Sequence, residues 1–258
     1  RPSFTLDTAF HAGAYYVQEA ASMFLDRVIK EYIDNPVTAL DLCAAPGGKS
    51  TLIRSVLPTG SLLFANEYVK NRSQILAENI IKWGNPDVIV TNNSPYDYSQ
   101  FNNLFDFILS DVPCSGEGMF RKDEMAISEW SVDNVHNCQK RQQEILTDIW
   151  GTLKENGILV YSTCTYNREE NEDNVKWIAQ ELGAEILQVP IDEKWNISGS
   201  LTDEGLPVYR FFPHRTKGEG LFMAVLRKKS KDIDSEDDNY SYADERKENK
   251  RNRKGSKG

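Results

Sequence analysis

The sequence predicts an α/β fold, built on a mostly parallel sheet with helices on both faces. Short apolar segments alternate with segments of helical periodicity along most of the chain, as βαβ units require. One apolar segment, 105–109, is almost wholly hydrophobic, which is typical of a strand buried on both faces. The 258 residues are 40% hydrophobic and 27% charged, which suits one large domain and excludes fibrous or wholly disordered proteins.

Short apolar segments, most of them bounded by turn residues, are the expected strands. In chain order they are 37–42, 61–65, 87–91, 105–109, 158–162, 185–189 and 221–226.

Segments whose apolar residues recur at helical spacing lie between these strands. The expected helices are 16–33, the segment from the turn near 48 to 57, 71–83, 135–154 and 169–182. The first ends at Asn35-Pro36, because the residue before a proline disfavours helical backbone. The second ends at Pro58 for the same reason.

The charge distribution divides the chain into two parts. The whole sequence has 30 basic and 39 acidic residues, of which 10 and 8 lie in 228–258, leaving 20 and 31, a net charge of −11, in 1–227. We expect 1–227 to be the folded domain, with 1–35 as its lead-in helix region, and 228–258 to be a disordered tail or linker. An acidic body binds nucleic acid poorly through its overall field, so such a role needs a local patch or another domain.

Several classes of protein are disfavoured. No apolar run approaches the roughly 18 residues of a membrane span, and the start of the sequence shows no secretion signal. The cysteines, Cys43, Cys114, Cys138 and Cys164, are therefore expected to be free thiols of a cytoplasmic protein. Scattered histidines and the lack of a CxxC pair argue against a metal site. We expect no membrane partner, and a monomer.

A turn of small residues follows the first strand. Residues 40–50 read LDLCAAPGGKS, which is not a phosphate loop, because Cys43 stands where that motif needs a glycine. Small side chains and the amides of a helix start can accommodate a ligand at the carboxyl end of a central strand. Glu67 ends the next strand, where a carboxylate can accept hydrogen bonds from ribose hydroxyls. The pattern indicates an adenosine-type cofactor; a tight turn beside a solvated glutamate is the alternative.

Two cysteines follow strands of the same expected sheet. Cys114 comes shortly after 105–109 and Cys164 shortly after 158–162, so both reach the edge that holds the small-residue turn. A reactive thiol needs the exposure and polar setting that such an edge provides. Cys138 lies within an expected helix and is interpreted as a structural residue.

Three segments, DLCAAPGGKS, DVPCSGEGMFRKDE and YSTCTYNREENE, together resemble the motifs of the RNA cytosine-5 methyltransferases of the Sun/Nop class. The extension GEGMFRKD and the opening HAGAYYVQEAASMF are similar to the bacterial ribosomal small-subunit methyltransferase F group. The resemblance covers about 1–227. It implies S-adenosylmethionine as methyl donor and a Rossmann-like methyltransferase sheet, mostly parallel with one antiparallel strand. Members often add RNA-binding modules, which we expect to be absent or cut away here.

The resemblance also implies a reaction and the residues that perform it. Cys164 is the expected nucleophile, which adds to carbon 6 of a cytosine so that carbon 5 can take the methyl group. Cys114 is expected to assist product release. Asp111 would contact the cytosine edge beside the cofactor, and Lys49 would point toward the base. DNA cytosine methyltransferases attack instead with the cysteine of a Pro-Cys pair, which would reverse the roles of the two cysteines.

The turn would hold the methionine end of the cofactor, and Glu67 its ribose. The expected cofactor-binding residues are Cys43, Ala44, Ala45, Pro46, Gly47, Gly48, Lys49, Glu67, Asn93 and Asp111. Many relatives carry an acid near the adenine where this chain has Asn93 or Ser94, and alanine where it has Val112.

Further residues are expected near the RNA. Arg121 and Lys122 follow a glycine-rich loop from which they could meet RNA phosphates. The residues expected at the entrance are His11, Tyr15, Gln18 and Glu19.

The sequence therefore predicts an S-adenosylmethionine-dependent enzyme that methylates carbon 5 of a cytidine in RNA, with small-subunit ribosomal RNA or its particle as the expected partner and transfer RNA left open. The target base must leave its stack to reach the thiol. A methyltransferase for proteins or small molecules is one rival, but it needs no pair of strand-end cysteines. A cofactor-binding RNA scaffold without catalysis is another, but it predicts loss of Cys164, Cys114, Asp111 or Lys49, and all four are present.

Overall fold

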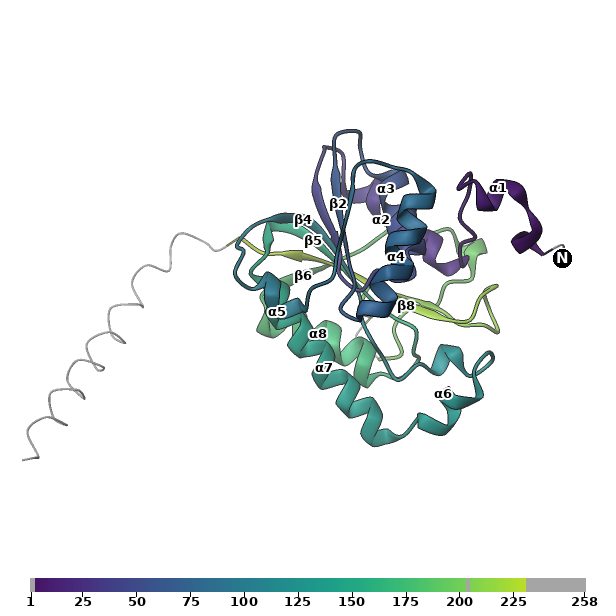
Figure 1. Ribbon diagram of the computed structural model, residues 1–258. Helices are drawn as coiled ribbons and strands as arrows, with labels where there is room; N and C mark the ends of the chain where they lie inside the picture. Colours follow the sequence, from purple (N-terminus) through teal and green to yellow (C-terminus); the bar gives the residue numbers. More distant parts are fainter. Residues whose placement is uncertain (1–2, 203–204, 231–258) are drawn as a thin grey trace, which may run out of the picture.

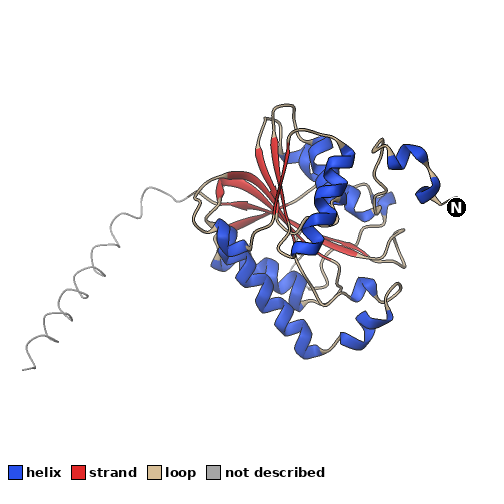
Figure 2. Cartoon of the chain, in the orientation of Figure 1, coloured by secondary structure: helices blue, strands red, loops and turns tan. Residues whose placement is uncertain are grey.

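The computed structural model describes residues 3–202 and 205–230, which form one eight-stranded mixed sheet between two layers of helices (Figure 1, Figure 2). The strand order is β3-β2-β1-β4-β5-β8-β6, and β7 also pairs with β8. The strands are β1 (Thr38–Asp41), β2 (Leu62–Asn66), β3 (Val88–Thr91), β4 (Phe105–Asp111), β5 (Leu153–Thr163), β6 (Ala184–Leu187), β7 (Val208–Phe211) and β8 (Leu221–Lys228).

The directions of the strands locate the expected ligand site. β1, β2, β3, β4 and β5 pair in parallel, whereas β8 runs antiparallel to β5, β6 and β7. The prediction of a mostly parallel sheet with one antiparallel strand is confirmed. From β1 the chain builds toward β3 on one side and later toward β5 on the other, so the strand order reverses between β1 and β4. Open α/β sheets bind ligands outside the carboxyl ends of the strands at such a point.

Helices cover both faces of the sheet (Figure 1). One face packs against α2 (Phe24–Tyr32), α3 (Gly48–Val56) and α4 (Lys70–Trp83). The other packs against α5 (Pro95–Tyr98), α7 (Val132–Trp150) and α8 (Asn174–Glu181). The shorter α1 (Thr8–His11) and α6 (Glu124–Glu129) contribute no buried residue.

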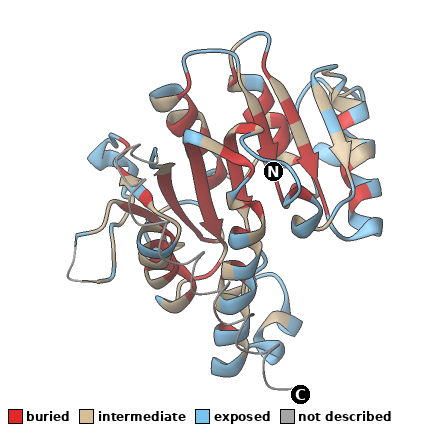
Figure 3. Ribbon diagram, turned by 90° about the vertical axis from the view of Figure 1, so that its left-hand side faces the viewer, coloured by how far each residue is buried: buried red, intermediate tan, exposed pale blue. Residues whose placement is uncertain are grey.

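Alternate residues of each central strand supply the two cores. In β4, Phe107 and Leu109 belong to the core under α2 and α3, and Ile108 belongs to the core under α7 and α8. The period of two follows from the geometry of a strand, whose successive side chains point to opposite faces. Figure 3 shows the strands as the buried centre, with the exposed surface concentrated on helices and loops.

Two predicted helix boundaries were wrong. The helix expected over 16–33 begins with a 3-10 turn at Ala21–Met23 and continues as α2, because the segment before it lies on the small-residue turn, where the Gln18 amide donates to the Gly48 carbonyl oxygen (2.7 Å). The helix expected to reach 154 ends at Trp150, since Leu153 already pairs with Phe105 at the start of β5.

Three other differences concern the second half of the chain. The sequence did not predict β7, because the charged Arg210 interrupts a short apolar run; its partner, Glu172, is 38 residues away. The helix expected over 169–182 is a π-helical turn, Glu169–Asp173, followed by α8. β8 continues through Lys228, one residue past the predicted domain boundary, and the rest of the expected tail from 231 lies outside the described residues.

Residues 3–202 and 205–230 contain neither a membrane-spanning helix nor a cluster of metal ligands. No helix there has the length and apolar character needed to cross a bilayer, and no group of three or more His, Cys, Asp or Glu side chains could hold a metal ion.

Candidate active site

The small-residue turn after β1 lies at the predicted edge of the sheet. Gly47 has a φ of 113°, a conformation that side-chain-bearing residues rarely adopt, and a Cβ there would lie 3.2 Å from Leu76 of α4. Neighbouring elements fix the turn: Arg72 donates to the Ala45 carbonyl oxygen (3.1 Å), and Asn79 to that of Pro46 (2.8 Å). Helix α4 thus holds one side of the turn, and the opposite side remains free to contact a ligand.

A cavity of about 210 Å³ opens above this turn. The lead-in segment supplies one wall with Tyr16, Val17, Gln18, Glu19 and Ser22, and the turn and β4 supply the other with Cys43, Ala44, Ala45, Pro46, Gly48, Lys49 and Asp111. Seven of the ten predicted cofactor-binding residues therefore line one cavity. Gly48 must be small, because a Cβ there would lie 2.9 Å from the Tyr16 ring. Gly47, Glu67 and Asn93 are not among the lining residues.

Glu67 follows β2 and is 3% exposed. Its Oε1 accepts a hydrogen bond from the Val69 amide (2.9 Å), whereas Oε2 has no hydrogen-bond partner in the described part of the chain, although Arg72 lies 3.4 Å away. A buried carboxylate oxygen without a donor is costly, so this oxygen is suited to a hydroxyl brought by a ligand.

The two candidates for an adenine contact differ in their existing bonds. The Ser94 hydroxyl donates to Asp97 (2.8 Å) and accepts from its amide (3.3 Å), which caps α5. Asn93 is anchored through its backbone amide, which donates to the Asn66 side chain (3.0 Å). The side chain of Ser94 is thus committed to the helix cap.

The two strand-end cysteines meet, with 3.1 Å between Cys114 Sγ and Cys164 Sγ, and both are free thiols. The hydrogen bond from the Cys114 thiol lowers the pKa of Cys164, and the same contact together with burial raises the pKa of Cys114 well above its ordinary value. Cys164 is therefore the member of the pair that ionises first. Cys43 is a less reactive thiol, because burial raises its pKa.

Lys49 and Asp111 form an ion pair beside the thiols, with 2.9 Å between Nζ and Oδ2. Ser162 donates to the other oxygen of Asp111 (2.5 Å). Burial opposes the charge of Lys49, but the nearby carboxylates of Asp111 and Asp41 outweigh it, and the pKa of Lys49 is raised. The positive charge of Lys49 also favours the Cys164 thiolate, whereas burial and the carboxylate of Asp111 oppose it more strongly.

Two acids that the sequence analysis did not single out, the half-buried Glu117 and the buried Glu170, join the two cysteine loops. Glu117 accepts from the amides of Tyr166 (2.6 Å) and Asn167 (2.9 Å), so it links the loop of Cys114 to that of Cys164. Glu170 accepts from the Ser115 amide (3.1 Å) and from Gln142 (2.7 Å). Both acids lie within the motifs quoted above, yet nothing in the sequence indicates which backbone amides they bind.

The residues expected near RNA are not all close to the site. Arg121 and Lys122 are exposed on the loop after Cys114, and Lys122 pairs with Glu219 (3.4 Å). Gln18 and Glu19 line the cavity, as expected. His11 and Tyr15 do not: His11 bonds the Thr5 carbonyl oxygen and Tyr15 bonds Asp7.

A sheet of this order, with a ligand cavity at its switch point, a buried acceptor after the next strand and two thiols at the same edge, is the architecture of a Rossmann-like methyltransferase with a thiol centre. The family model of the 16S rRNA methyltransferases RsmB/F matches residues 31–227, and the chain belongs to this family. The predicted family and fold are thereby confirmed.

The chain is similar to several known proteins. It is 36% identical over 232 residues to ribosomal RNA small subunit methyltransferase F of Aliivibrio salmonicida, covering 88% of this chain and 48% of the relative. It is 35% identical to the protein of the same name from Pectobacterium atrosepticum, covering 84% and 45%. The chain thus spans about half the length of the curated relatives it matches.

The chain is also similar to solved structures of methyltransferases. NSun6 from Pyrococcus horikoshii, crystallised with SFG, is 31% identical with a TM-score of 0.77, covering 90% of this chain and 57% of that one. A methyltransferase homologue from the same organism is 28% identical with a TM-score of 0.74, covering 88% and 73%.

Proposed function

We propose that this protein transfers a methyl group from S-adenosylmethionine to carbon 5 of a cytidine in small-subunit ribosomal RNA, through a covalent bond between Cys164 and carbon 6. The observation that carries the proposal is the 3.1 Å contact between Cys114 and Cys164, close to Lys49 and Asp111, which line the ligand cavity. The names of the curated relatives support ribosomal RNA as the substrate. Such a substrate would place the protein in the cytoplasm; a monomer without a metal ion stays a prediction.

The residues around the cavity suit S-adenosylmethionine, which supplies an electrophilic methyl group when bound. The Oε2 of Glu67, which accepts no hydrogen bond in the described part of the chain, would accept ribose hydroxyls. The turn of Ala44 to Gly48 would hold the methionine end against Gln18 and Tyr16. Of the two adenine candidates, Asn93 is favoured: the Ser94 hydroxyl both donates to and accepts from Asp97, whereas the Asn93 side-chain amide, which bonds Tyr98, has further donor and acceptor capacity.

Cys164 would act as the nucleophile. Carbon 5 of cytosine is weakly nucleophilic, and bonding of a thiolate to carbon 6 raises the electron density at carbon 5. Cys114 and Lys49 both favour the thiolate form of Cys164. Asp111, held by Ser162 and Lys49, would contact the cytosine edge and hold the ring over the thiol.

Cys114 would assist the release of product. After carbon 5 is methylated, its proton passes to solvent water, the electron pair of the carbon–hydrogen bond re-forms the double bond between carbons 5 and 6, and the bond between carbon 6 and Cys164 breaks. The sulfur then departs as a thiolate, and the Cys114 thiol at 3.1 Å can donate a hydrogen bond or a proton to it. The raised pKa of Cys114 keeps this proton in place. The reversed assignment, with Cys114 attacking, would require the cysteine with the raised pKa to ionise first.

Three cysteine variants test these roles. Cys164→Ala should abolish methyl transfer to small-subunit ribosomal RNA and keep cofactor affinity, measured by calorimetry. Cys114→Ala should also lose turnover, while forming protein–RNA adducts that resist denaturing gels. Cys138→Ala, a cysteine within α7, is the matched control and should retain activity. Normal turnover by Cys164→Ala would overturn the mechanism, and adducts formed by that variant but not by Cys114→Ala would establish the reversed roles.

A further inference from the structure

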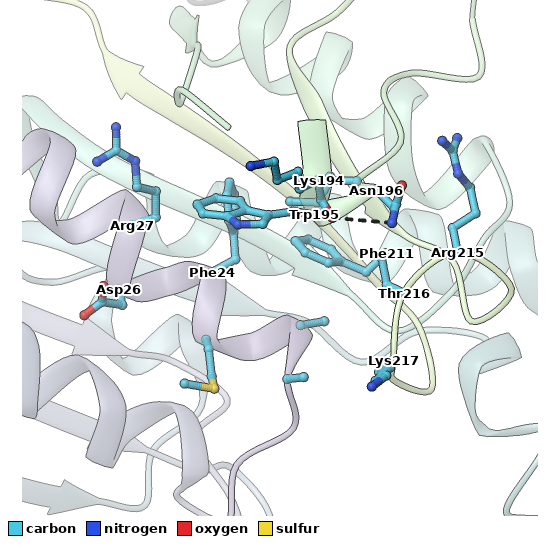
Figure 4. A pocket seen from close by; sticks show the side chains of 14 residues that line it. Phe24, Asp26, Arg27, Lys194, Trp195, Asn196, Phe211, Arg215, Thr216 and Lys217 are labelled. Carbon is cyan, nitrogen blue, oxygen red and sulfur yellow. Dashed lines mark hydrogen bonds between the residues drawn. The ribbon is translucent and has the colours of Figure 1, made fainter. Parts of the chain in front are cut away.

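A second, larger cavity of about 560 Å³ lies between α2, the turn Glu193–Trp195 and the segment that follows β7 (Figure 4). Its size is within the range of ligand-binding pockets. Its floor is aromatic: Phe24 and Phe211 are each 6% exposed, and their ring centroids are 5.5 Å apart. Trp195 belongs to the same lining but is 46% exposed. An exposed indole beside a buried aromatic floor offers a face on which a nucleic-acid base can stack.

The charges around this cavity differ from those of the molecule. Residues 1–227 carry a net charge of −11, yet the charged lining residues are Arg27, Lys194, Arg215, Lys217 and the acid Asp26. Two of these charges are already paired, Asp26 with Lys30 (2.9 Å) and Arg27 with Glu31 (3.0 Å).

The remaining three cations are available. Lys194 and Lys217 have no ion-pair partner within 3–202 and 205–230, and Arg215 donates only to the neutral Ser198 hydroxyl (2.9 Å). Two acids precede Lys194; Asp192 accepts from the Lys194 amide (2.9 Å), and Glu193 begins the turn. A local group of unpaired cations next to an exposed indole favours a polyanion with aromatic bases over an apolar partner.

The lead-in segment separates this cavity from the candidate active site. The lead-in segment lines both: Glu19 and Ser22 face the cofactor cavity, and Ala20 and Met23 face the second. On the other side, the loop that carries Lys217 continues to Glu219 and Gly220, which pack against Gly118.

The end of that loop lies at the thiols. The Gly118 amide donates to the Cys164 carbonyl oxygen (2.8 Å), and a Cβ on Gly118 would lie 3.2 Å from the Glu219 carbonyl oxygen. A single strand of RNA that leaves the thiol centre along this loop would therefore reach Lys217 and Trp195.

We propose that this cavity is a subsite for the single-stranded RNA that flanks the target cytidine, with one base stacked on Trp195 and phosphates bound by Lys194, Arg215 and Lys217. The inference rests on the proposed function and extends it from the target base to its neighbours. It also explains how an acidic body can hold RNA: the cations needed are concentrated in one place. Contacts of this kind bind RNA with little preference for sequence.

The test is the affinity for a fluorescein-labelled, unstructured RNA of about 12 nucleotides, measured by anisotropy from low to moderate KCl. Trp195→Ala should weaken binding at least about fivefold without changing the salt dependence, and Trp195→Phe, which keeps a ring, should restore most of it. Lys217→Met and Arg215→Met should each reduce the slope of log affinity against log salt by about 0.7, because each removes one phosphate contact to a single strand.

Two matched controls lie elsewhere. Phe101→Ala removes an aromatic side chain of equal exposure, 46%, and Lys140→Met removes an exposed cation of α7 on the opposite face. Neither should change affinity or slope. Because Trp195→Ala could disturb the fold, melting temperatures are compared, and the two cation variants and Trp195→Phe then decide the outcome.

The outcomes separate this inference from the proposed function. Unchanged affinity and slope in every cavity variant would overturn the subsite even if the wild type methylates RNA. Reduced affinity and slope would support it even if Cys114→Ala forms no adduct, a result that would count against the proposed function alone. Variants that lose binding to the small ribosomal subunit but not to naked RNA would assign the cavity to a protein and overturn the inference.

Discussion

Replacing Arg210 with methionine tests whether a buried ion pair stabilises the loop that carries Cys164. Arg210 and Glu172 are 1% and 0% exposed in their side chains. The guanidinium donates to both carboxylate oxygens, with 2.8 Å from Nε to Oε1, and its third bond goes to the Tyr166 carbonyl oxygen (2.8 Å). Arg210→Met would leave Glu172 buried with the Leu201 amide as its remaining donor.

Removal of one partner of a buried ion pair costs about 3–5 kcal/mol, because the other charge is left without compensation. We expect Arg210→Met to lower the free energy of unfolding by that amount, out of a total of about 5–15 kcal/mol. The measurement is urea unfolding monitored by tryptophan fluorescence. The double variant Arg210→Met, Glu172→Leu should regain part of it, since no buried charge remains. Arg227→Met is the control: its pair with Glu185 (3.5 Å) is exposed and should contribute about 0–1 kcal/mol.

A loss below about 1 kcal/mol in Arg210→Met would refute this reasoning, because a buried charge would then be tolerated without its partner. A double variant less stable than the single one would also contradict it.

Three further predictions concern the site. Gly118→Ala places a Cβ 2.7 Å from the Cys164 carbonyl oxygen, so methyl transfer should fall about a hundredfold with cofactor affinity kept; near-normal turnover would show that the loop can move aside. Burial raises the pKa of Asp41 to about 7, so the free energy of unfolding should fall as pH rises from about 4 to 7. Asp41→Asn should flatten the plot of the free energy of unfolding against pH, measured by urea titration at each pH. An unchanged slope would mean that another group titrates. Asn93→Ala should weaken cofactor binding, whereas Ser94→Ala should cost only about 1 kcal/mol of stability; weaker cofactor binding in the serine variant alone would reverse this assignment.

The fold was largely predictable because its signals are local. The strands β1 to β4 are short, mainly apolar segments, and the glycine-rich turn and Pro58 define where α3 lies. The approach of Cys114 to Cys164 followed from the same reasoning, since neighbouring parallel strands β4 and β5 end at one edge.

What could not be predicted depends on contacts between distant residues. The segment of Gln18 has helical periodicity, but it binds the turn at Gly48 instead of forming a helix. Arg210 makes a strand look polar, and only its bond to Glu172 explains why it is buried. Glu117 spans 50 residues of sequence to bind Asn167. Local patterns carry no information about such partners.

The central claim is that Cys164 forms the bond to RNA and Cys114 releases it. The most direct measurement incubates Cys114→Ala with S-adenosylmethionine and small-subunit ribosomal RNA, digests the protein–RNA adduct and locates the linkage by mass spectrometry. We predict a cytidine bonded to the peptide that contains Cys164 and carrying the added methyl group. A linkage to any other residue, or normal turnover of Cys114→Ala without an adduct, would contradict the account.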